Sequence, residues 1–363
     1  EGITGTPISH YLYPERRSAH VAAEVASGEL TDTQHCQPAL LAVGASLTRA
    51  LEACGVTPDV VAGHSVGEFS AAVAGGVLDI ADGVRWAALR GKAMSALGGE
   101  TGAMAAIVAA RAEVEELLVE GAQIANVNHP RQMVVSGSSD AVEQVARASE
   151  ARGWKTVRLA VSHGFHSSVF DTLDLDAVVE GLALRDPKIP VASCIDAAPY
   201  ADAAAARSVF RRHATSPVLF DGTVRQCQDL DVDIYLQVSA GGPLRSFVRG
   251  SLAEGNAAVL SIASKHDDDG GRSFLHGLGE LFVRGVDVDP RAVTAPAPVA
   301  SLPPELLPKQ RYWLIGERSK ALKLAGIEPK AARAAEPPAR STAMTEESAV
   351  EPALAKAAAA TIS

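Results

Sequence analysis

The chain has 363 residues, of which 47% are hydrophobic and 21% are charged. This composition is typical of globular proteins and excludes wholesale disorder, and the length predicts two domains or one large domain with appendages. The formal charge of −10 and the aromatic content of 4% argue against partners such as nucleic acid or an anionic membrane, which require clustered Lys and Arg or stacking rings.

The four cysteines lie far apart and include no CxxC pair, so the sequence predicts neither a metal site nor a disulfide framework. It has no apolar run of about 18 residues, as a membrane span requires, and no signal peptide is recognisable. We therefore expect a cytoplasmic protein.

The first hundred residues predict a short buried strand among helices. Residues 1–30 read as irregular, and Thr31, Asp32 and Thr33 offer helix-capping side chains. The expected elements are a helix over 38–54, a strand over 58–63, a helix of small residues that ends at 75–76, and a helix over 80–97.

Residues 104–161 show a different order of predicted strands and helices. The expected elements are strands over 104–109, 123–127, 132–136 and 155–161, with helices over 112–119 and 140–152. This βαββαβ order is the ferredoxin-like pattern. We therefore expect a small subdomain over 102–162 that is inserted into a larger α/β unit.

The larger unit then comprises residues 1–101 and 163–289. Its second part contains plausible core strands over 189–193 and 234–238 and an amphipathic helix over 273–284. Residues 290–318 are rich in Pro and predict an extended linker. Residues 319–363 consist mostly of Ala, Pro, Glu and Lys and predict a disordered tether.

The segment Gly63-His64-Ser65-Val66-Gly67 matches GxSxG, the nucleophile elbow. A strand precedes it and a helix follows it, as this motif requires. Ser65 is the candidate nucleophile, and the amide of Val66 is placed to stabilise an oxyanion above it. The alternative interpretation is a glycine-rich helix start.

A serine nucleophile needs a base. Three histidines are candidates: His166, which follows the last strand of the predicted insert, and its rivals His163 and His129. No acidic residue stands in a recognisable motif as a third member. Position along the chain favours His166 without excluding the others.

Arg90 lies on an otherwise apolar stretch just downstream of the elbow. A guanidinium beside a nucleophile can grip a substrate carboxylate with two parallel hydrogen bonds. The alternative is an ordinary arginine on the helix surface.

Six motifs in order make the chain resemble the acyltransferase domains of type I polyketide and fatty acid synthases, the malonyl-CoA:acyl carrier protein transacylase family. The matching segments are GHSVGE at 63–68, RG at 90–91, VNHP with VVSG at 127–137, HGFHS at 163–167, SPVLF at 216–220 and QRYWL at 310–314. The resemblance implies an α/β-hydrolase-like core with a ferredoxin-like insert.

The resemblance also implies roles for individual residues. Ser65 would be acylated and His166 would be its base, oriented by a carbonyl or amide group rather than a carboxylate. Arg90 would bind the malonyl carboxylate, His64 would lie beside the acyl group, and Asn128 would belong to the insert's edge of the cleft. The substrate would be malonyl-CoA, and no bound cofactor or metal is implied.

Phe165 and Val66 fall on the malonyl side of the family's substrate patterns. A phenylalanine wall leaves no room for an α-methyl group, although one methyl group discriminates by only ~1–3 kcal/mol.

The chain departs from the family pattern at several points. The family's N-terminal GQGSQ segment, which supplies a second oxyanion contact, is not in this sequence. Gly164 replaces an alanine, which we expect to add freedom beside His166, and Phe170 replaces a methionine. The segment Tyr11-Leu12-Tyr13-Pro14 is similar to that of iterative enediyne and polyunsaturated fatty acid synthases.

The sequence therefore predicts transfer of a malonyl unit to the phosphopantetheine thiol of an acyl carrier protein, in antibiotic-type polyketide synthesis. The implied partners are that carrier domain and a ketosynthase domain of the same megasynthase. A serine hydrolase that uses the same elbow and a non-catalytic acyltransferase-like domain are the alternatives.

Overall fold

The computed structural model describes residues 2–13, 30–97, 101–161, 163–239, 241–252, 257–263 and 271–292. The predicted tether over 319–363 lies outside these residues. So does the predicted linker over 290–318, apart from a single 3-10 turn, η3, at Pro290–Ala292. All of the described residues belong to one compact unit.

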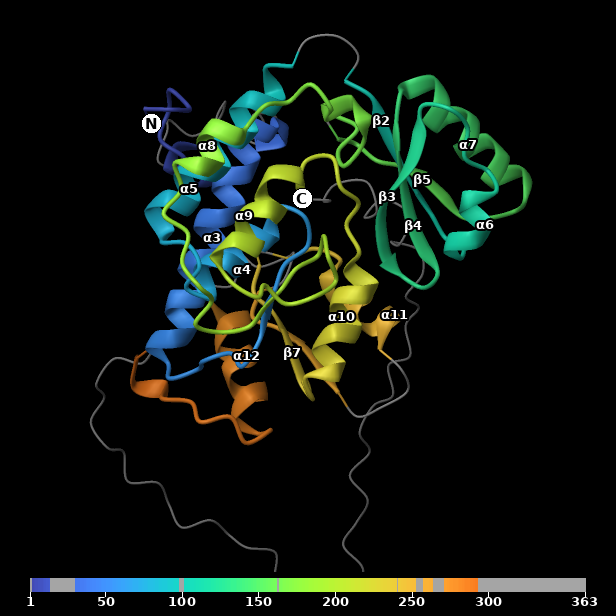
Figure 1. Ribbon diagram of the computed structural model, residues 1–363. Helices are drawn as coiled ribbons and strands as arrows, with labels where there is room; N and C mark the ends of the chain where they lie inside the picture. Colours follow the sequence, from blue (N-terminus) through green and yellow to red (C-terminus); the bar gives the residue numbers. More distant parts are fainter. Residues whose placement is uncertain are drawn as a thin grey trace, which may run out of the picture. The chain divides into compact units, whose positions relative to one another are not determined.

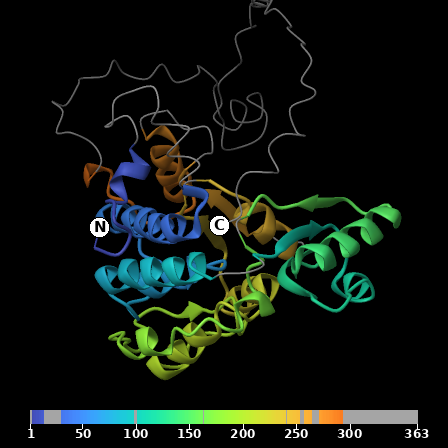
Figure 2. The ribbon, with the colours of Figure 1, turned by 90° about the horizontal axis from the view of Figure 1, so that it is seen from above.

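Three helices and a short strand build the first part of the larger subdomain (Figure 1). Helix α3 (Thr33–Ala53) lies beside helix α5 (Ile80–Ser95), as the view from above also shows (Figure 2). Strand β1 (Val61–Ala62) leads into helix α4 (Gly67–Ala74). A short helix α1 (Ser9–Leu12) precedes them.

Helix α3 begins five residues before the expected start at Pro38. The side chain of Asp32 accepts a hydrogen bond from the Gln34 amide at 3.1 Å and so caps the helix. The prediction treated Pro38 as a first-turn residue, but Pro38 lies inside the helix. The extra turn matters because it carries Gln37, which contacts the candidate site.

The second part of the larger subdomain contains more helices than the sequence predicted. Its elements are η2 (Ser168–Phe170), α8 (Asp176–Glu180), β6 (Val191–Ala192), α9 (Ala203–Arg212), α10 (Phe220–Asp229), β7 (Ile234–Gln237), α11 (Leu244–Ser251), β8 (Ala258–Ser261) and α12 (Arg272–Phe282). Strand β6 pairs in parallel with β1, and β7 pairs in parallel with β8. The expected strands therefore form, but they are short.

The small subdomain is the predicted insert (Figure 1). Its elements are β2 (Ala103–Ile107), α6 (Arg111–Glu115), β3 (Ala122–His129), β4 (Gln132–Gly137), α7 (Ser139–Ala151) and β5 (Thr156–Arg158). The antiparallel sheet has the order β3-β4-β2-β5, and α6 and α7 cover one face. This is the ferredoxin-like arrangement, so the predicted fold class is confirmed.

Each subdomain has its own apolar core. Phe69, Trp86 and Phe210 are buried together in the larger one, whereas Ile107 and Met133 lie in that of the insert. Two backbone hydrogen bonds join strand β3 to residue 218, from Val127 N to Val218 O at 2.8 Å and from Val218 N to Ala125 O at 2.7 Å. This contact fixes the insert against the segment that includes Ser216, whose carbonyl oxygen lies beside His166.

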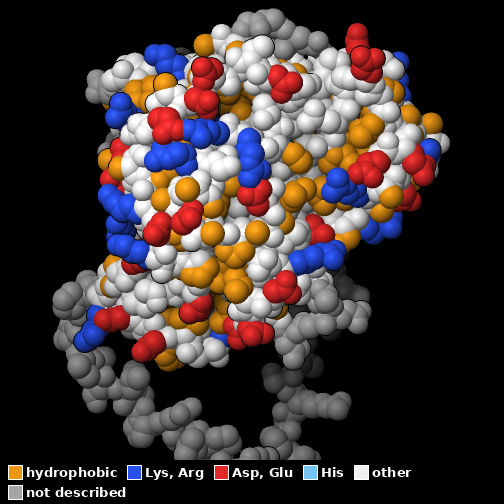
Figure 3. Space-filling model, in the orientation of Figure 1, with side chains coloured by type: hydrophobic (Ala, Val, Ile, Leu, Met, Phe, Trp, Pro, Cys, Tyr) orange, Lys and Arg blue, Asp and Glu red, His pale blue; other side chains and the backbone are white. Residues whose placement is uncertain are grey.

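Charges of both signs are interspersed on the face shown in Figure 3. No helix in the described part of the chain is long and apolar enough to cross a membrane.

Candidate active site

A strained turn between β1 and α4 presents Ser65. Its φ is +51°, in the left-handed region that side chains other than glycine rarely adopt. A Cβ atom on Gly63 would lie 2.1 Å from the carbonyl carbon of Gly67, so only glycine fits there. The GxSxG glycine at 63 therefore permits the tight approach, and the turn places Ser65 at the start of a helix.

His166 lies directly beside Ser65. Its Nε2 is 2.7 Å from Ser65 Oγ, and its Nδ1 is 2.9 Å from the carbonyl oxygen of Ser216. Because a carbonyl oxygen only accepts, Nδ1 carries the proton and Nε2 is free to accept the hydroxyl proton. The structure thus shows a backbone carbonyl at the position where a carboxylate stands in a Ser-His-Asp triad.

His166 is held in the form that a general base requires. Burial, and then the nearby His213 and Arg90, lower the pKa of His166 well below its usual range. The imidazole is therefore neutral at pH 7 and can take a proton. Its φ of +57° is a second strained backbone at the site.

The rival histidines are placed elsewhere. The ring of His163 packs against Phe165 and Phe170, with centroid distances of 5.9 Å to each. His129 is at the end of β3, where its ring is 6.5 Å from that of Phe247. The structure brings His166 to Ser65 and neither rival.

The amide of Val66 lies at the start of a helix and is the candidate oxyanion donor. Val66 caps α4, and its N–H makes no hydrogen bond to any residue that the structure describes. The positive end of the helix dipole adds to its attraction for an anion above Ser65.

Arg90 is buried rather than on the helix surface, with 3% of its area exposed. Its Nη1 donates to Gln37 Oε1 at 2.6 Å and its Nη2 donates to His213 Nδ1 at 3.3 Å. Among the described residues no carboxylate forms an ion pair with it, and its Nε has no partner. Burial lowers the pKa of Arg90 to about 10, so it stays charged at pH 7.

Gly91 explains how Arg90 reaches Gln37. A Cβ atom at 91 would lie 2.5 Å from the carbonyl oxygen of Thr33. The backbone of α5 therefore touches that of α3, and the Arg-Gly pair needs its glycine for packing.

These side chains meet in one open cavity. About 540 Å³ of empty space lies in it, a volume that includes open solvent at its mouth. Its lining includes the candidate nucleophile, the candidate base, the buried cation and their neighbours: Ser65, His166, Arg90, His64, Phe165 and Asn126.

His64 lines the cavity, and Asn128 stands behind it. His64 Nε2 is 2.8 Å from Asn128 Oδ1, and Asn128 Nδ2 donates to Gln132 Oε1 at 3.1 Å. Burial lowers the pKa of His64, which is consistent with a neutral ring that donates through Nε2. Asn128 therefore orients His64 and is not itself part of the cavity lining.

Phe165 is held in place as one wall of the cavity. Its ring stacks on that of Phe170 at 5.8 Å and 6° between planes, and Phe170 is fully buried. The aromatic residue at 170, a departure from the family pattern, thus supports Phe165. Gly164 is expected to add freedom beside His166, and a Cβ atom there would make a tight contact of 3.0 Å with the Gly137 carbonyl oxygen.

One protein-family model matches most of the chain. The model of the acyl transferase domain matches residues 14–288, which include all of these site residues. The chain belongs to the acyl transferase domain family.

A curated relative supports this family assignment. Polyketide synthase GfsA of Streptomyces halstedii is 39% identical over 302 residues, which are 81% of this chain and 4% of that protein. The chain therefore spans a small part of the length of the curated relatives that it matches.

Solved structures show the same fold. The acyltransferase domain from the second module of the salinomycin polyketide synthase is 32% identical, with a TM-score of 0.71 over 80% of this chain and 67% of that one. The malonyl-CoA:acyl carrier protein transacylase of Xanthomonas oryzae pv. oryzae is 30% identical, with a TM-score of 0.65 over 73% and 84%.

Sequence reasoning missed several residues of this acyl transferase site. Gln37 and His213 hold Arg90, Asn126 lines the cavity, and the Ser216 carbonyl orients His166. The one available signal was a polar side chain in an otherwise apolar segment, as for Gln37 within 37–47. A backbone carbonyl leaves no signal of that kind.

Proposed function

We propose that this acyl transferase moves a malonyl unit from malonyl-CoA, through an ester on Ser65, to the phosphopantetheine thiol of an acyl carrier protein. The observation that carries the proposal is Arg90, a buried cation without an acidic partner in the cavity that holds Ser65 and His166. Because buried charges are normally paired, we expect the cavity to bind an anionic acyl group that pairs with Arg90.

The first half-reaction uses the hydrogen bond already present. His166 Nε2 takes the Ser65 hydroxyl proton as Oγ attacks the thioester carbonyl. The oxyanion that forms is stabilised by the Val66 amide. The C–S bond then breaks, and protonated His166 gives its proton to the departing CoA sulfur.

The second half-reaction reverses the roles. His166 takes the proton of the phosphopantetheine thiol, whose sulfur attacks the malonyl ester. The Ser65 oxygen leaves and regains its proton from His166. A carrier domain is the proposed acceptor and a ketosynthase domain of the same megasynthase the proposed neighbour, because the matched polyketide synthase is far longer than this chain.

Arg90 supplies the selection for a carboxylate. A guanidinium pairs with a carboxylate through two parallel hydrogen bonds, and bonds to charged groups contribute ~1.5–3 kcal/mol. An acetyl group gains nothing from this cation. Phe165, stacked on Phe170, supplies the selection against an α-methyl group.

Intact-protein mass spectrometry with malonyl-CoA tests the proposal. We expect a malonyl adduct on the wild-type chain and none on Ser65→Ala, because the ester needs the Ser65 oxygen. Malonyl-CoA consumption without any adduct would instead indicate a serine hydrolase. Absence of both adduct and turnover would indicate a non-catalytic domain.

A further inference from the structure

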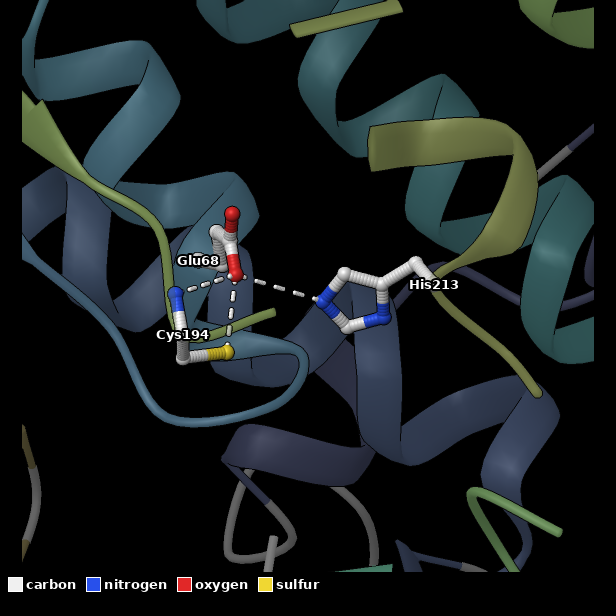
Figure 4. Close-up of side chains that lie close together, drawn as sticks. All are labelled: Glu68, Cys194 and His213. Atoms are coloured by element: carbon white, nitrogen blue, oxygen red, sulfur yellow. Dashed lines mark hydrogen bonds and ion pairs between the residues drawn. The ribbon is translucent and has the colours of Figure 1, made fainter. Parts of the chain in front are cut away.

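A cluster of polar groups is buried directly behind the cavity. Glu68, in α4, has no exposed area, and its Oε2 accepts from the Cys194 amide at 2.9 Å and from Cys194 Sγ at 2.7 Å. Tyr200 donates its hydroxyl proton to the other oxygen, Oε1. His213 Nε2 lies 3.7 Å from Oε2, and Figure 4 shows His213 and Cys194 meeting at this one oxygen.

The carboxyl group of Glu68 is ionised. Burial alone would raise its pKa, but the nearby His213 and the hydrogen bonds from Cys194 and Tyr200 together hold the pKa of Glu68 below its usual value. An anion is therefore fixed within the core of a chain whose cavity wall carries a buried cation.

His213 connects this anion to Arg90. A guanidinium can only donate, so the bond from Arg90 Nη2 requires that His213 Nδ1 be unprotonated. The proton of a neutral ring then sits on Nε2, which faces Glu68. The ring of His213 is fully buried. Its Nε2 proton lies on the side of the Glu68 carboxylate, and its Nδ1 lone pair lies on the side of the Arg90 guanidinium.

Phe69 confines both partners. The guanidinium carbon of Arg90 lies 5.4 Å from the centroid of the Phe69 ring, and the His213 ring is 4.6 Å from the same ring. Neither side chain can swing away without displacing a fully buried aromatic residue.

We propose that His213 and Glu68 are positioning residues for Arg90: neutral His213 relays the charge of Glu68 to the guanidinium, fixes it at the cavity wall, and so sets the preference for carboxylated acyl groups. This inference rests on the proposed function. Neither residue touches the cavity, and both act through Arg90.

A metal ion is the competing interpretation of this cluster. Glu68, Cys194 and His213 offer ligand atoms within 4.8 Å of one another. However, a sulfur and an oxygen that bind one tetrahedral zinc ion lie about 3.5 Å apart, whereas Cys194 Sγ is only 2.7 Å from Glu68 Oε2. A thiol that donates to a carboxylate is the arrangement we infer.

Two isosteric substitutions separate the two ends of the imidazole. In His213→Asn, Oδ1 takes the place of Nδ1, so the acceptor for Arg90 remains. In His213→Gln, the amide reaches the place of Nε2, so the contact with Glu68 remains but the acceptor for Arg90 is lost. Val209→Ala, four residues earlier on a buried apolar face of α9, is the matched control for lost stability.

The measurement is the rate of loading of Ser65 from malonyl-CoA and from acetyl-CoA in each variant. We expect His213→Gln to lower the malonyl-to-acetyl ratio about tenfold, which corresponds to ~1.4 kcal/mol, through a higher KM for malonyl-CoA. His213→Asn should lower it at most about threefold, on the same scale. Glu68→Gln should also lower it, and Val209→Ala should leave it unchanged.

The outcomes distinguish the two proposals. A wild-type chain that loads neither acyl group contradicts the proposed function and this inference together. Normal malonyl loading with an unchanged ratio in both His213→Gln and His213→Asn contradicts this inference alone. So does one equivalent of zinc in the purified protein that is lost in Cys194→Ser.

Discussion

At the scale of single residues, three linked groups form the path proposed for proton transfer at Ser65. The serine hydroxyl, the imidazole and the Ser216 carbonyl are linked by bonds of 2.7 Å and 2.9 Å. The carbonyl fixes the tautomer without adding a titratable group. The base therefore owes its low pKa first to burial, and its availability at neutral pH follows from that.

Substitution of each histidine tests which one is the base. His166→Ala should slow loading from malonyl-CoA about a thousandfold or more, as loss of a base does in serine–histidine systems. His163→Ala should cost far less, because His163 packs on Phe165 and does not meet Ser65. Single-turnover loading rates check this, and equal losses in the two variants would refute the choice of His166.

Phe165 provides the test of acyl-group size. Phe165→Ala should raise the ratio of methylmalonyl to malonyl loading by ~10–200-fold, the discrimination that one methyl-sized group supplies. Competition between the two CoA thioesters, read by mass, measures the ratio. The matched variant Phe170→Leu leaves Phe165 in place and should change the ratio less. An unchanged ratio in Phe165→Ala would show that another wall excludes the methyl group.

At the scale of elements, the site depends on how closely α5 approaches α3. The contact occurs at Gly91, and it lets Arg90 reach Gln37 across the helix pair. The close contact of the two backbones thus helps to set the position of the Arg90 side chain on the cavity wall.

Gly91→Ala should therefore destabilise the fold. Its Cβ atom would lie 2.5 Å from one backbone atom and 2.9 Å from another, so the helices must separate, at a cost of ~1–3 kcal/mol. The control is Gly279→Ala in α12, where nothing lies within 4 Å of the new atom and alanine should stabilise the helix by ~0.5–1 kcal/mol. Urea denaturation measures both, and equal effects would contradict the close contact.

The sequence predicted the elements well where a local pattern governs them. The insert shows its alternation of strand and helix directly, and the elbow shows its glycines. The helices α8 to α11 were not predicted, because each has only five to ten residues, too few for an apolar period to stand out in the sequence. The positions of Glu68 and His213 could not be predicted either, because 145 residues separate two groups that only the fold brings together.

At the scale of the whole molecule, the buried histidines couple stability to pH. Burial lowers the pKa of His64, His166 and His213 from the ordinary value of 6.5. The unfolded chain therefore binds protons below pH 6.5 that the folded chain excludes. By linkage, the free energy of unfolding must fall as the pH falls below that value.

The expected slope is up to ~1.4 kcal/mol per pH unit for each histidine, or about 4 kcal/mol for all three. Denaturation series at pH 7.5, 6.5 and 5.5 measure it. His213→Asn should reduce the slope by the contribution of one histidine, which is up to ~1.4 kcal/mol per pH unit. Stability that stays constant between pH 7 and pH 5 would contradict the neutral state of these rings.

The ratio of malonyl to acetyl loading in Arg90→Ala tests most directly whether Arg90 selects a carboxylated acyl group. Malonyl loading should fall by roughly ten- to several hundredfold, given the energy of a charge-assisted pair, whereas acetyl loading should hold steady or rise. Arg85→Ala, at an exposed position of the same helix, should change neither. If Arg90→Ala lowers both loadings by the same factor, Arg90 is a structural residue and the account is contradicted.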